Sequence, residues 1–399
     1  MTAEISIMNS QGIAIAADSA VTIGNTGNYK TYYTAQKVFN LSKKHFVGIM
    51  IYGEVEFMNI NMEIIINEFS KALGDRVFDT LEEYAKYLLV FLKNFKYVDT
   101  DQKEFLKLTS CSFFKEIKES YEGDISENYR DQEISKAQQS KILAGVLKKA
   151  REILENTTTN VNFTDDGFVE ANKAIITKEV EEVFPDFTIN DKTKEELMDL
   201  FLLDISKVEI GSWWYFHTGI VFAGYGDKEL FPSTVDFVLY GKLGNNVLHT
   251  ELSIKDHSSY PIHPYSQTNI ITSFIMGIHP EFEYKIDKEL DKLTKELTDI
   301  TGKKYTEEIS KKIKELKDKI ESFQKTEFRD PVFDIVDSLP KSELAEMAEA
   351  LVNITALRQH VSTELETVGG PTDVALITRT DGFVWIKKKQ IFSGIQENK

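Results

Sequence analysis

The sequence predicts an α+β fold, in which two antiparallel sheets pack face to face between helical layers and helical insertions interrupt this core. Three observations predict it. Strand-like segments are paired through turns at both ends of the chain, the apolar period changes from two to about 3.6 after Gly53, and strand patterns return beyond residue 215. Four strands, two helices, an insertion, three strands, further helices and two last strands follow in that order. A four-layer αββα sandwich satisfies this order.

Two β-hairpins are predicted at the start of the chain. Residues 4–8 alternate polar and apolar side chains, a turn sequence follows, and residues 12–17 resume in extended form. Residues 37–41 and 46–51 form the second pair. The segment 24–34 between the hairpins is rich in Gly, Asn, Tyr and Thr, and we expect a loop there.

Helical periodicity follows the hairpins. One apolar face repeats between residues 58 and 73, and a capping sequence at residues 80–83 starts a second helix that runs to about Tyr97. Residues 99–206 are polar and mostly helical. Strand patterns then return in the segments 217–224, 234–240 and 247–252.

A heptad pattern of apolar residues covers residues 286–323 and is interrupted at Thr301-Gly302. This pattern predicts a protruding antiparallel helical hairpin. A further helix runs toward Glu364, and residues 373–386 form a last β-hairpin around an Asp-Gly turn. The basic run Lys387–Lys389 is expected to be solvated.

These patterns divide the chain into five parts, which alternate between core and insertion. The parts are 1–98 (first part of the core), 99–206 (helical insertion), 207–280 (core strands and a helix), 281–335 (coiled-coil-like helical hairpin insertion) and 336–399 (core helix and C-terminal β-hairpin). The core is therefore expected to be discontinuous in sequence.

The composition excludes several classes of protein. The 399 residues include 47 Lys and Arg against 64 Asp and Glu, and this net charge of −17 argues against a nucleic-acid or membrane partner. Apolar stretches are too short to cross a bilayer, and no signal peptide is expected. A single Cys111 excludes a disulfide framework and a multi-Cys zinc site and fits the cytoplasm. The seven His residues show no metal-ligand spacing, so no metal or other cofactor is expected.

The N-terminus carries the first candidate for chemistry. Met1 precedes Thr2, and an initiator Met is ordinarily removed before a small second residue. Removal would leave Thr2 with a free α-amine beside its hydroxyl, which is a base and a nucleophile held on one residue. The alternative is that Thr2 has no such role, because Thr at position two is common in ordinary cytosolic proteins.

Two charged residues can lie near Thr2. Asp18 ends the second strand of the first hairpin, 16 residues after Thr2, and a tight hairpin brings its two ends together. Lys37 opens the next strand and can point to the same end of the sheet. A Lys there would lower the pKa of a nearby hydroxyl by its field. The alternative is a surface Asp–Lys pair at a strand end, which contributes little to stability.

Four separated segments carry a resemblance to a known family. The sequence resembles the proteasome β-subunit superfamily of N-terminal nucleophile (Ntn) hydrolases, as a bacterial-type member with large helical insertions. The matching segments are Gly12 to Ser19 with Thr22 shortly after, Lys37-Val38-Phe39, Gly48 to Gly53, and Val368-Gly369-Gly370 followed by residues 373–385.

The resemblance implies a threonine-type peptidase or amidohydrolase. Thr2 Oγ would attack a peptide carbonyl, and its own amine would take the proton. Lys37 would lower the pKa of the nucleophile, and Asp18 would orient Lys37. A backbone N–H at Tyr52 or Gly53 would stabilise the oxyanion.

The resemblance also implies how a substrate binds. The backbone around Thr22 would pair with an extended peptide or protein substrate. Val21, Ala35 and Met50 would line an apolar specificity pocket. Family members usually assemble into rings, so the resemblance implies a homo-oligomer. The alternative is that the large insertions cap the site, change the symmetry or keep the protein monomeric or dimeric. Two supporting residues are implied, Ser19 and Ser266.

Some positions depart from the family pattern. Tyr52 stands where the family often has Gly, and Leu365 and Val368 stand where it has a supporting Asp and Ser. These departures favour a second hypothesis, a non-catalytic structural or binding subunit that keeps the same sandwich. Fold alone does not choose between the two.

Overall fold

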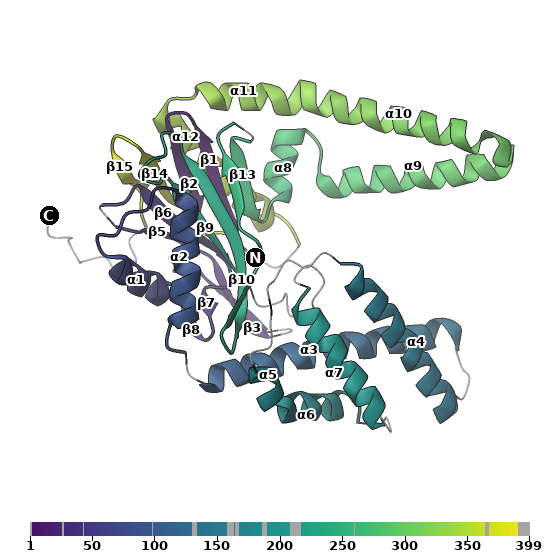
Figure 1. Cartoon of the computed structure of the whole chain (residues 1–399). Coiled ribbons are helices and arrows are strands. Elements are labelled where there is room, and N and C mark those ends of the chain that lie inside the picture. The colour runs from purple at the N-terminus through teal and green to yellow at the C-terminus, as the bar shows by residue number, and fades with distance from the viewer. Residues whose placement is uncertain are drawn as a thin grey trace.

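The computed structural model of the chain contains two antiparallel sheets that face each other, with helices against the outer face of each (Figure 1). It describes residues 2–25, 28–42, 44–97, 99–129, 134–157, 163, 167–185, 190–207, 217–258, 260–363 and 367–389. The predicted α+β class with antiparallel sheets is confirmed.

The first sheet carries the N-terminus. Its strands, in spatial order, are β13 (Ile262–Ser266), β1 (Ala3–Asn9), β2 (Gly12–Ala17), β14 (Asp373–Thr378) and β15 (Gly382–Lys387). Both predicted hairpins of this sheet are present, since β1 pairs with β2 and β14 with β15. The outer face is covered by α8 (Asn269–Met276), α11 (Asp330–Ser338) and α12 (Lys341–His360), which share an apolar cluster with it.

The second sheet contains the other predicted hairpin. Its strands, in order, are β11 (Asn246–His249), β10 (Ser233–Leu243), β9 (Thr218–Gly224), β6 (Val47–Gly53) and β5 (Val38–Asn40), and β12 (Ser253–Asp256) also pairs with β10. Helices α1 (Met62–Leu73) and α2 (Leu81–Asn94) cover its outer face with the apolar faces that the period of 3.6 predicts.

The inner faces of the two sheets meet in a third apolar cluster. It includes Met8, Ile13 and Ile15 of the first sheet and Met50 and Val221 of the second. Burial on both faces explains why β2 and β9 read as nearly continuous apolar runs, since neither face meets water.

Five helices form a separate apolar cluster beside the second sheet. They are α3 (Asp99–Asn128), α4 (Lys136–Glu155), α5 (Phe168–Ala171), α6 (Lys173–Val183) and α7 (Asp191–Ile205). Their buried residues pack against Tyr240, Leu243 and Leu248 of β10 and β11. The predicted polar, mostly helical character of this stretch is confirmed, and its own core explains why it folds.

The heptad segment forms a long arm. Helices α9 (Pro280–Thr301) and α10 (Thr306–Gln324) lie antiparallel and project away from the sheets (Figure 1). A short 3₁₀ turn, Lys303–Tyr305, joins them, and a π-helical turn, Lys325–Arg329, leads into α11. Several heptad side chains remain exposed, because one hairpin alone cannot enclose its own seam: Leu293, Ile300, Leu316 and Phe323. Of the helices in the described ranges, none is both long and apolar enough to cross a membrane.

The expectation of a loop over residues 24–34 is wrong. Strands β3 (Val21–Asn25) and β4 (Asn28–Tyr32) pair there as a two-stranded antiparallel sheet. Thr and Tyr favour extended backbone, and this preference outweighs the Gly and Asn content that suggested a loop. The side chains of Tyr29 and Tyr32 stay exposed, so the segment lacks the apolar alternation that would have identified it.

Two further features were not predicted. Strands β12 and β13 extend the two sheets, and β13 brings Ser266 opposite Ala3. The prediction that Lys387–Lys389 are solvated is wrong for Lys389. The side chain of Lys389 is buried, forms an ion pair with Asp373 at 2.6 Å and donates to the carbonyl of Ala35 at 2.6 Å.

Candidate active site

Strand β1 and the residue before it place Glu4 and Thr2 between the two sheets. Side chains alternate along a strand, and Ala3, Ile5 and Ile7 of β1 pack against the helices. Glu4 therefore points to the inner side, and Thr2 follows the same alternation. The Thr2 hydroxyl donates to Glu4 Oε2 at 2.9 Å, which is consistent with a shared face.

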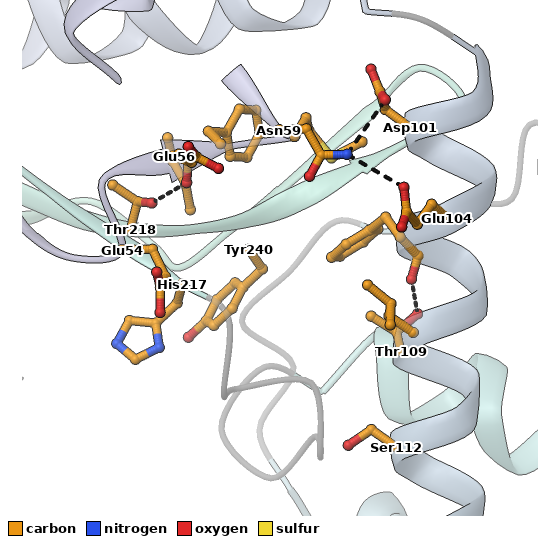
Figure 2. A pocket seen from close by; sticks show the side chains of 15 residues that line it. Glu54, Glu56, Asn59, Asp101, Glu104, Thr109, Ser112, His217, Thr218 and Tyr240 are labelled. Carbon is orange, nitrogen blue, oxygen red and sulfur yellow. Dashed lines mark hydrogen bonds between the residues drawn. The ribbon is translucent and has the colours of Figure 1, made fainter. Parts of the chain in front are cut away.

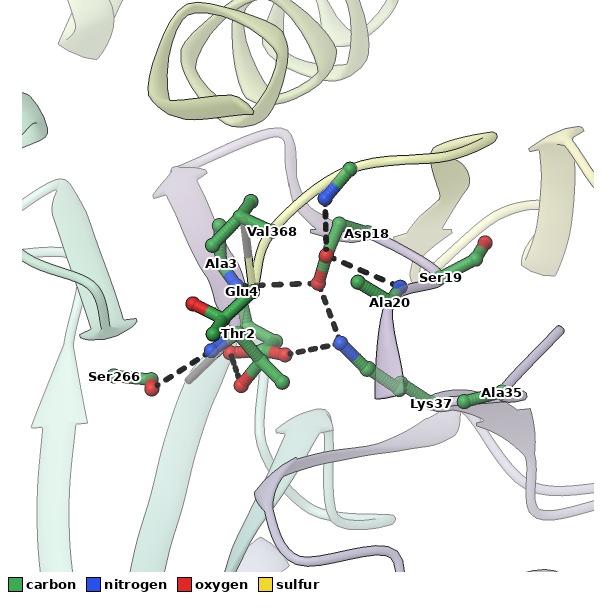
Figure 3. Close-up of polar contacts among 12 residues, drawn as sticks. Thr2, Ala3, Glu4, Asp18, Ser19, Ala20, Ala35, Lys37, Ser266 and Val368 are labelled. Atoms are coloured by element: carbon green, nitrogen blue, oxygen red, sulfur yellow. Dashed lines mark hydrogen bonds and ion pairs between the residues drawn. The ribbon is translucent and has the colours of Figure 1, made fainter. Parts of the chain in front are cut away.

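The strand ends explain why distant residues meet here. In an antiparallel pair, the start of one strand lies beside the end of the next. Thr2 precedes β1 and Asp18 follows β2 in the first sheet, while Lys37 precedes β5 and Gly53 ends β6 in the second. Hydrogen bonds and ion pairs link Thr2, Asp18 and Lys37 there, directly or through Glu4 (Figure 3). The N–H of Gly53 joins them by its contact with Thr2 Oγ.

Lys37 holds two carboxylates at the centre of the site. Its Nζ lies 2.5 Å from Asp18 Oδ1 and 3.3 Å from Glu4 Oε1, and all three side chains are at most 1% exposed. The surface Asp–Lys pair considered from the sequence is therefore wrong, because this pair is buried. Lys37 reaches Thr2 through the Glu4 carboxylate.

Backbone N–H groups hold Asp18 in place. Its carboxylate accepts from Ala3 and Ala20 at 3.2 Å each and from Gly369 at 2.8 Å. Hydrogen bonds of this kind stabilise a carboxylate and fix its orientation. The Gly-Gly turn near the C-terminus thus contributes directly to the position of Asp18, and through Asp18 to that of Lys37.

Thr2 is contacted at its backbone nitrogen and at its hydroxyl oxygen. The nitrogen donates to Ser266 Oγ at 3.3 Å, so the structure brings Ser266, suggested as a supporting residue, to Thr2. The N–H of Gly53 points to Thr2 Oγ at 3.4 Å. Gly53 has φ +79°, and a Cβ there would lie 2.6 Å from the His217 carbonyl oxygen, so this position requires Gly.

Of the two predicted oxyanion donors, Gly53 is the one whose N–H is aimed at Thr2. The Tyr52 ring stacks on Tyr265 with centroids 5.5 Å apart and lies over Gly219, which has no side chain to obstruct it. Burial raises the pKa of the Tyr52 phenol. Tyr52 therefore packs between the sheets as a neutral ring.

Glu4 is the residue of the site that sequence reasoning missed. It is fully buried, and burial raises the pKa of its carboxyl to about 8; the charge of Lys37 opposes this shift and that of Asp18 adds to it. Glu4 was missed because a polar residue in an alternating strand is usually taken to face solvent. Its position two residues after Thr2, which places both side chains on the same face of the strand, could have identified it.

The predicted substrate-binding residues divide into two groups. Val21 and Thr22 lie on β3 and are half-buried, and Thr22 Oγ1 is 3.3 Å from Thr31 Oγ1 of β4. Ala35 is half-buried, and its N–H donates to the Ser19 carbonyl at 3.2 Å. Met50 is a correction: it is fully buried between the sheets and presents no surface to a ligand.

The remaining family positions have structural contacts of their own. Ser19 Oγ donates to the Pro371 carbonyl and ties the end of β2 to the turn before β14. Val368 is buried against the helices, and its N–H donates to Gln359 Oε1 at 2.5 Å. Leu365 lies outside the described residues.

A cavity of about 300 Å³ begins one residue beyond Gly53 (Figure 2). Strand β7 (Glu56–Phe57) and the turn Met58-Asn59 before β8 (Ile60–Asn61) lie on one side of it, and α3 lies on the other. Its described lining is Glu54, Glu56, Phe57, Met58, Asn59, Asp101, Glu104, Phe105, Leu108, Thr109, Ser112, His217, Thr218, Leu239 and Tyr240. Apolar walls and acidic side chains are thus combined beside the site.

The site contains a hydroxyl, two carboxylates, a Lys and a backbone donor within hydrogen-bonding reach of one another. This set can activate an oxygen nucleophile and stabilise an oxyanion without any added group. In the described part of the chain, no group of three or more His, Cys, Asp or Glu side chains is arranged to hold a metal ion.

Comparisons with known proteins add little to this geometry. No family model matches the chain, and no curated protein matches its sequence. Among solved structures, the chain aligns with the Anbu (Gly-1) mutant from Hyphomicrobium sp. strain MC1 at 11% identity and a TM-score of 0.31, over 99% of this chain and 88% of that one. A TM-score this low carries no argument about fold or function.

Proposed function

We propose that this protein is a threonine-type peptidase or amidohydrolase of the proteasome-like Ntn-hydrolase class, with Thr2 as nucleophile after removal of Met1. One observation carries the proposal: Thr2, Asp18, Lys37 and the Gly53 N–H meet at one buried end of the space between the two sheets. The order of layers, with paired sheets between helices, supports the same class.

The reaction follows from these positions. Thr2 Oγ attacks the carbonyl carbon of a peptide bond and transfers its proton to a neighbouring base. The carbonyl oxygen becomes an oxyanion, and the Gly53 N–H beside Oγ donates to it. The C–N bond then breaks, the amine leaves with the proton, and water hydrolyses the ester left on Thr2. The charge of Lys37 favours the negative charge that develops in this buried space.

The experiment that tests the proposal is an intact-mass measurement with a peptide epoxyketone, an electrophile that requires both a free Thr amine and its hydroxyl. We expect the purified protein to lack Met1 and to gain a single adduct. Thr2→Ala should gain none, and Thr2→Ser should still react, because Ser keeps both groups. Wild-type protein that retains Met1 and gains no adduct would contradict the proposal.

The burial of Thr2 favours a second candidate, a non-catalytic subunit with the same sandwich. Only 3% of Thr2 is exposed while Met1 is attached, so a substrate reaches it only after Met1 is removed or a neighbouring segment moves. Such a subunit would bind partners through other surfaces, for example the α9–α10 arm. The mass experiment separates the two candidates, because a non-catalytic subunit gives no adduct.

The cavity beyond Gly53 leads to an expectation about substrates. Four of its described lining residues are acidic, namely Glu54, Glu56, Asp101 and Glu104, and none is Lys or Arg. We expect fluorogenic peptides with Lys or Arg beside the cut bond to be hydrolysed about 3- to 10-fold faster than matched Glu peptides, since one such charge contact is worth about 1 kcal/mol in water. The Glu54→Gln, Glu56→Gln double variant should reduce this ratio, while Glu63→Gln on α1 should not. An unchanged ratio in the double variant would remove the cavity from the substrate path.

A further inference from the structure

We propose that Glu4 is the general base that takes the proton from the Thr2 hydroxyl, a role that the α-amine of Thr2 would otherwise have. This inference rests on the proposed function and names a further catalytic residue for it. It is carried by contacts of Glu4 on both sides, to the nucleophile and to Lys37.

The geometry is that of a base and its proton donor. A general base must lie about 2.6–3.2 Å from the group whose proton it takes. Glu4 Oε2 accepts from Thr2 Oγ1 at 2.9 Å, within that range. The nitrogen of Thr2, which is a peptide amide while Met1 is attached, donates to Ser266 Oγ at 3.3 Å. The hydroxyl thus already donates its proton to the carboxylate.

A buried carboxylate at this position requires an explanation. Lys37 already has a close partner in Asp18 at 2.5 Å, so Glu4 in its ionised form adds a second negative charge to one cation. Burial of an extra charge is unfavourable for folding, and an uncharged side chain would avoid this. Glu4 faces Asp18 at the end of β2, Lys37 before β5 and Tyr52 of β6. Of these neighbours only Lys37 favours its ionised form.

This environment suits a base. Because burial raises the pKa of Glu4 to about 8, its ionised form is a much stronger proton acceptor than an ordinary carboxylate. A base works best when its pKa lies near the working pH. The same shift means that Glu4 carries a proton below about pH 8, so reaction through this base must become faster as the pH rises through that value.

The protons balance through both halves of the reaction. In the first half, Oγ bonds to the carbonyl carbon as its proton moves to Glu4 Oε2, and Glu4 then gives that proton to the leaving nitrogen as the C–N bond breaks. In the second half, Glu4 takes a proton from water as its oxygen adds to the ester. Glu4 returns the proton to Thr2 Oγ when the C–Oγ bond breaks.

The test is the rate at which a β-lactone acylates Oγ, measured by intact mass from pH 5 to pH 9.5. A β-lactone forms a covalent bond to the hydroxyl oxygen only, so, unlike the epoxyketone, it needs no bond to the amine. For wild-type protein we expect the rate to rise to a plateau above about pH 8. Glu4→Gln should react at least 100-fold more slowly at the plateau and should lose this rise, as expected for loss of a general base. Glu4→Asp should recover part of the rate.

Two matched variants separate this role from a structural one. Ser6 follows Glu4 on the same face of β1 and is equally buried, and Ser6→Ala should keep the wild-type rate and pH profile. Asp18→Asn removes the other carboxylate on Lys37 and should lower the rate while keeping the rise with pH. A loss of the rise in Glu4→Gln alone is therefore the signature of the base.

Three outcomes would overturn the inference. If Glu4→Gln reacts like wild type with the same rise, Glu4 is not the base, and the proposed function survives. If wild-type protein is not acylated at any pH, both fail. If Glu4→Gln does not fold, the decision passes to Glu4→Asp, whose shorter carboxylate should give a lower plateau rate, and a plateau rate equal to that of wild type then rejects the role.

Thermal unfolding gives an independent check of the buried carboxyl. The folded state keeps the Glu4 proton up to about pH 8, whereas the unfolded chain releases it near the ordinary value of 4.5. The wild-type midpoint temperature should therefore fall, relative to that of Glu4→Gln, as the pH is raised from 5 to 9. Parallel curves would show that Glu4 is not a titrating buried group.

Discussion

Replacement of Lys37 with Met is expected to destabilise the protein by about 3–5 kcal/mol at neutral pH and to abolish reaction at Thr2. Lys37 is the shared cation of two carboxylates, Asp18 and Glu4, and all three side chains are at most 1% exposed. Without it, the buried carboxylate of Asp18 has no ion-pair partner, and Glu4, whose pKa is no longer held down by the charge of Lys37, stays protonated. Chemical denaturation of wild type and variant at pH 7 measures the loss of stability.

The pH dependence of this loss is a sharper test than its size. The pKa of Glu4 is about 8 in the wild type, where the charge of Lys37 favours the ionised form, and it should be higher in Lys37→Met. The deficit of Lys37→Met should therefore be larger at about pH 9.5 than at pH 7, where Glu4 is protonated in both proteins. Lys255→Met, which removes the partner of the less buried Asp236, serves as control and should cost much less. A deficit for Lys37→Met no larger than that of the control would show that the cluster is not strongly coupled.

Replacement of Gly53 with Ala is expected to lower activity about 10²- to 10³-fold, the usual effect of losing one oxyanion donor. Gly53 has φ +79°, and an added Cβ would lie 2.6 Å from the backbone oxygen of His217. Because that oxygen belongs to the backbone, the Gly53 segment must move, and its N–H must leave Thr2 Oγ. Initial rates of peptide hydrolysis and denaturation curves check the two consequences.

The matched control for Gly53 lies at the tip of the helical arm. Gly302 has φ +76°, close to the φ of Gly53, but nothing within 4 Å of an added Cβ. Gly302→Ala should therefore show only the conformational cost, about 1–3 kcal/mol, and unchanged activity. If Gly53→Ala retains wild-type activity, its N–H is not the donor that stabilises the oxyanion.

The antiparallel hairpins were predictable from the sequence, and with them the approach of Asp18 to Thr2. Alternation in residues 4–8 and 12–17 predicts β1 and β2, and pairing of their ends brings Asp18 near Thr2. Lys37 lies at the start of β5, which pairs with β6 in the other sheet, so its contact with Asp18 depends on how the two sheets pack. Local patterns of this kind are enough wherever the partner strand is the next one along the chain.

Features that depend on distant segments were not predictable. Alternation shows that Glu4 and Ile5 face opposite ways, but it does not show that a second sheet, rather than water, covers the Glu4 side. Ser266 reaches Thr2 because β13 pairs with β1 across more than half of the chain. Lys389 belongs to a basic run, yet its burial depends on Asp373 and on the Ala35 carbonyl.

The two halves of the site belong to different sheets. Thr2, Glu4 and Asp18 come from the first sheet, and Lys37 and Gly53 come from the second. Neither sheet alone contains a complete reactive centre, so a nascent chain with only one sheet formed has an ordinary, inert threonine. We therefore expect Thr2 to become reactive only when the two sheets have packed together. A movement of one sheet relative to the other would separate Thr2 and Glu4 from Lys37 and Gly53, and would stop the reaction without breaking a covalent bond.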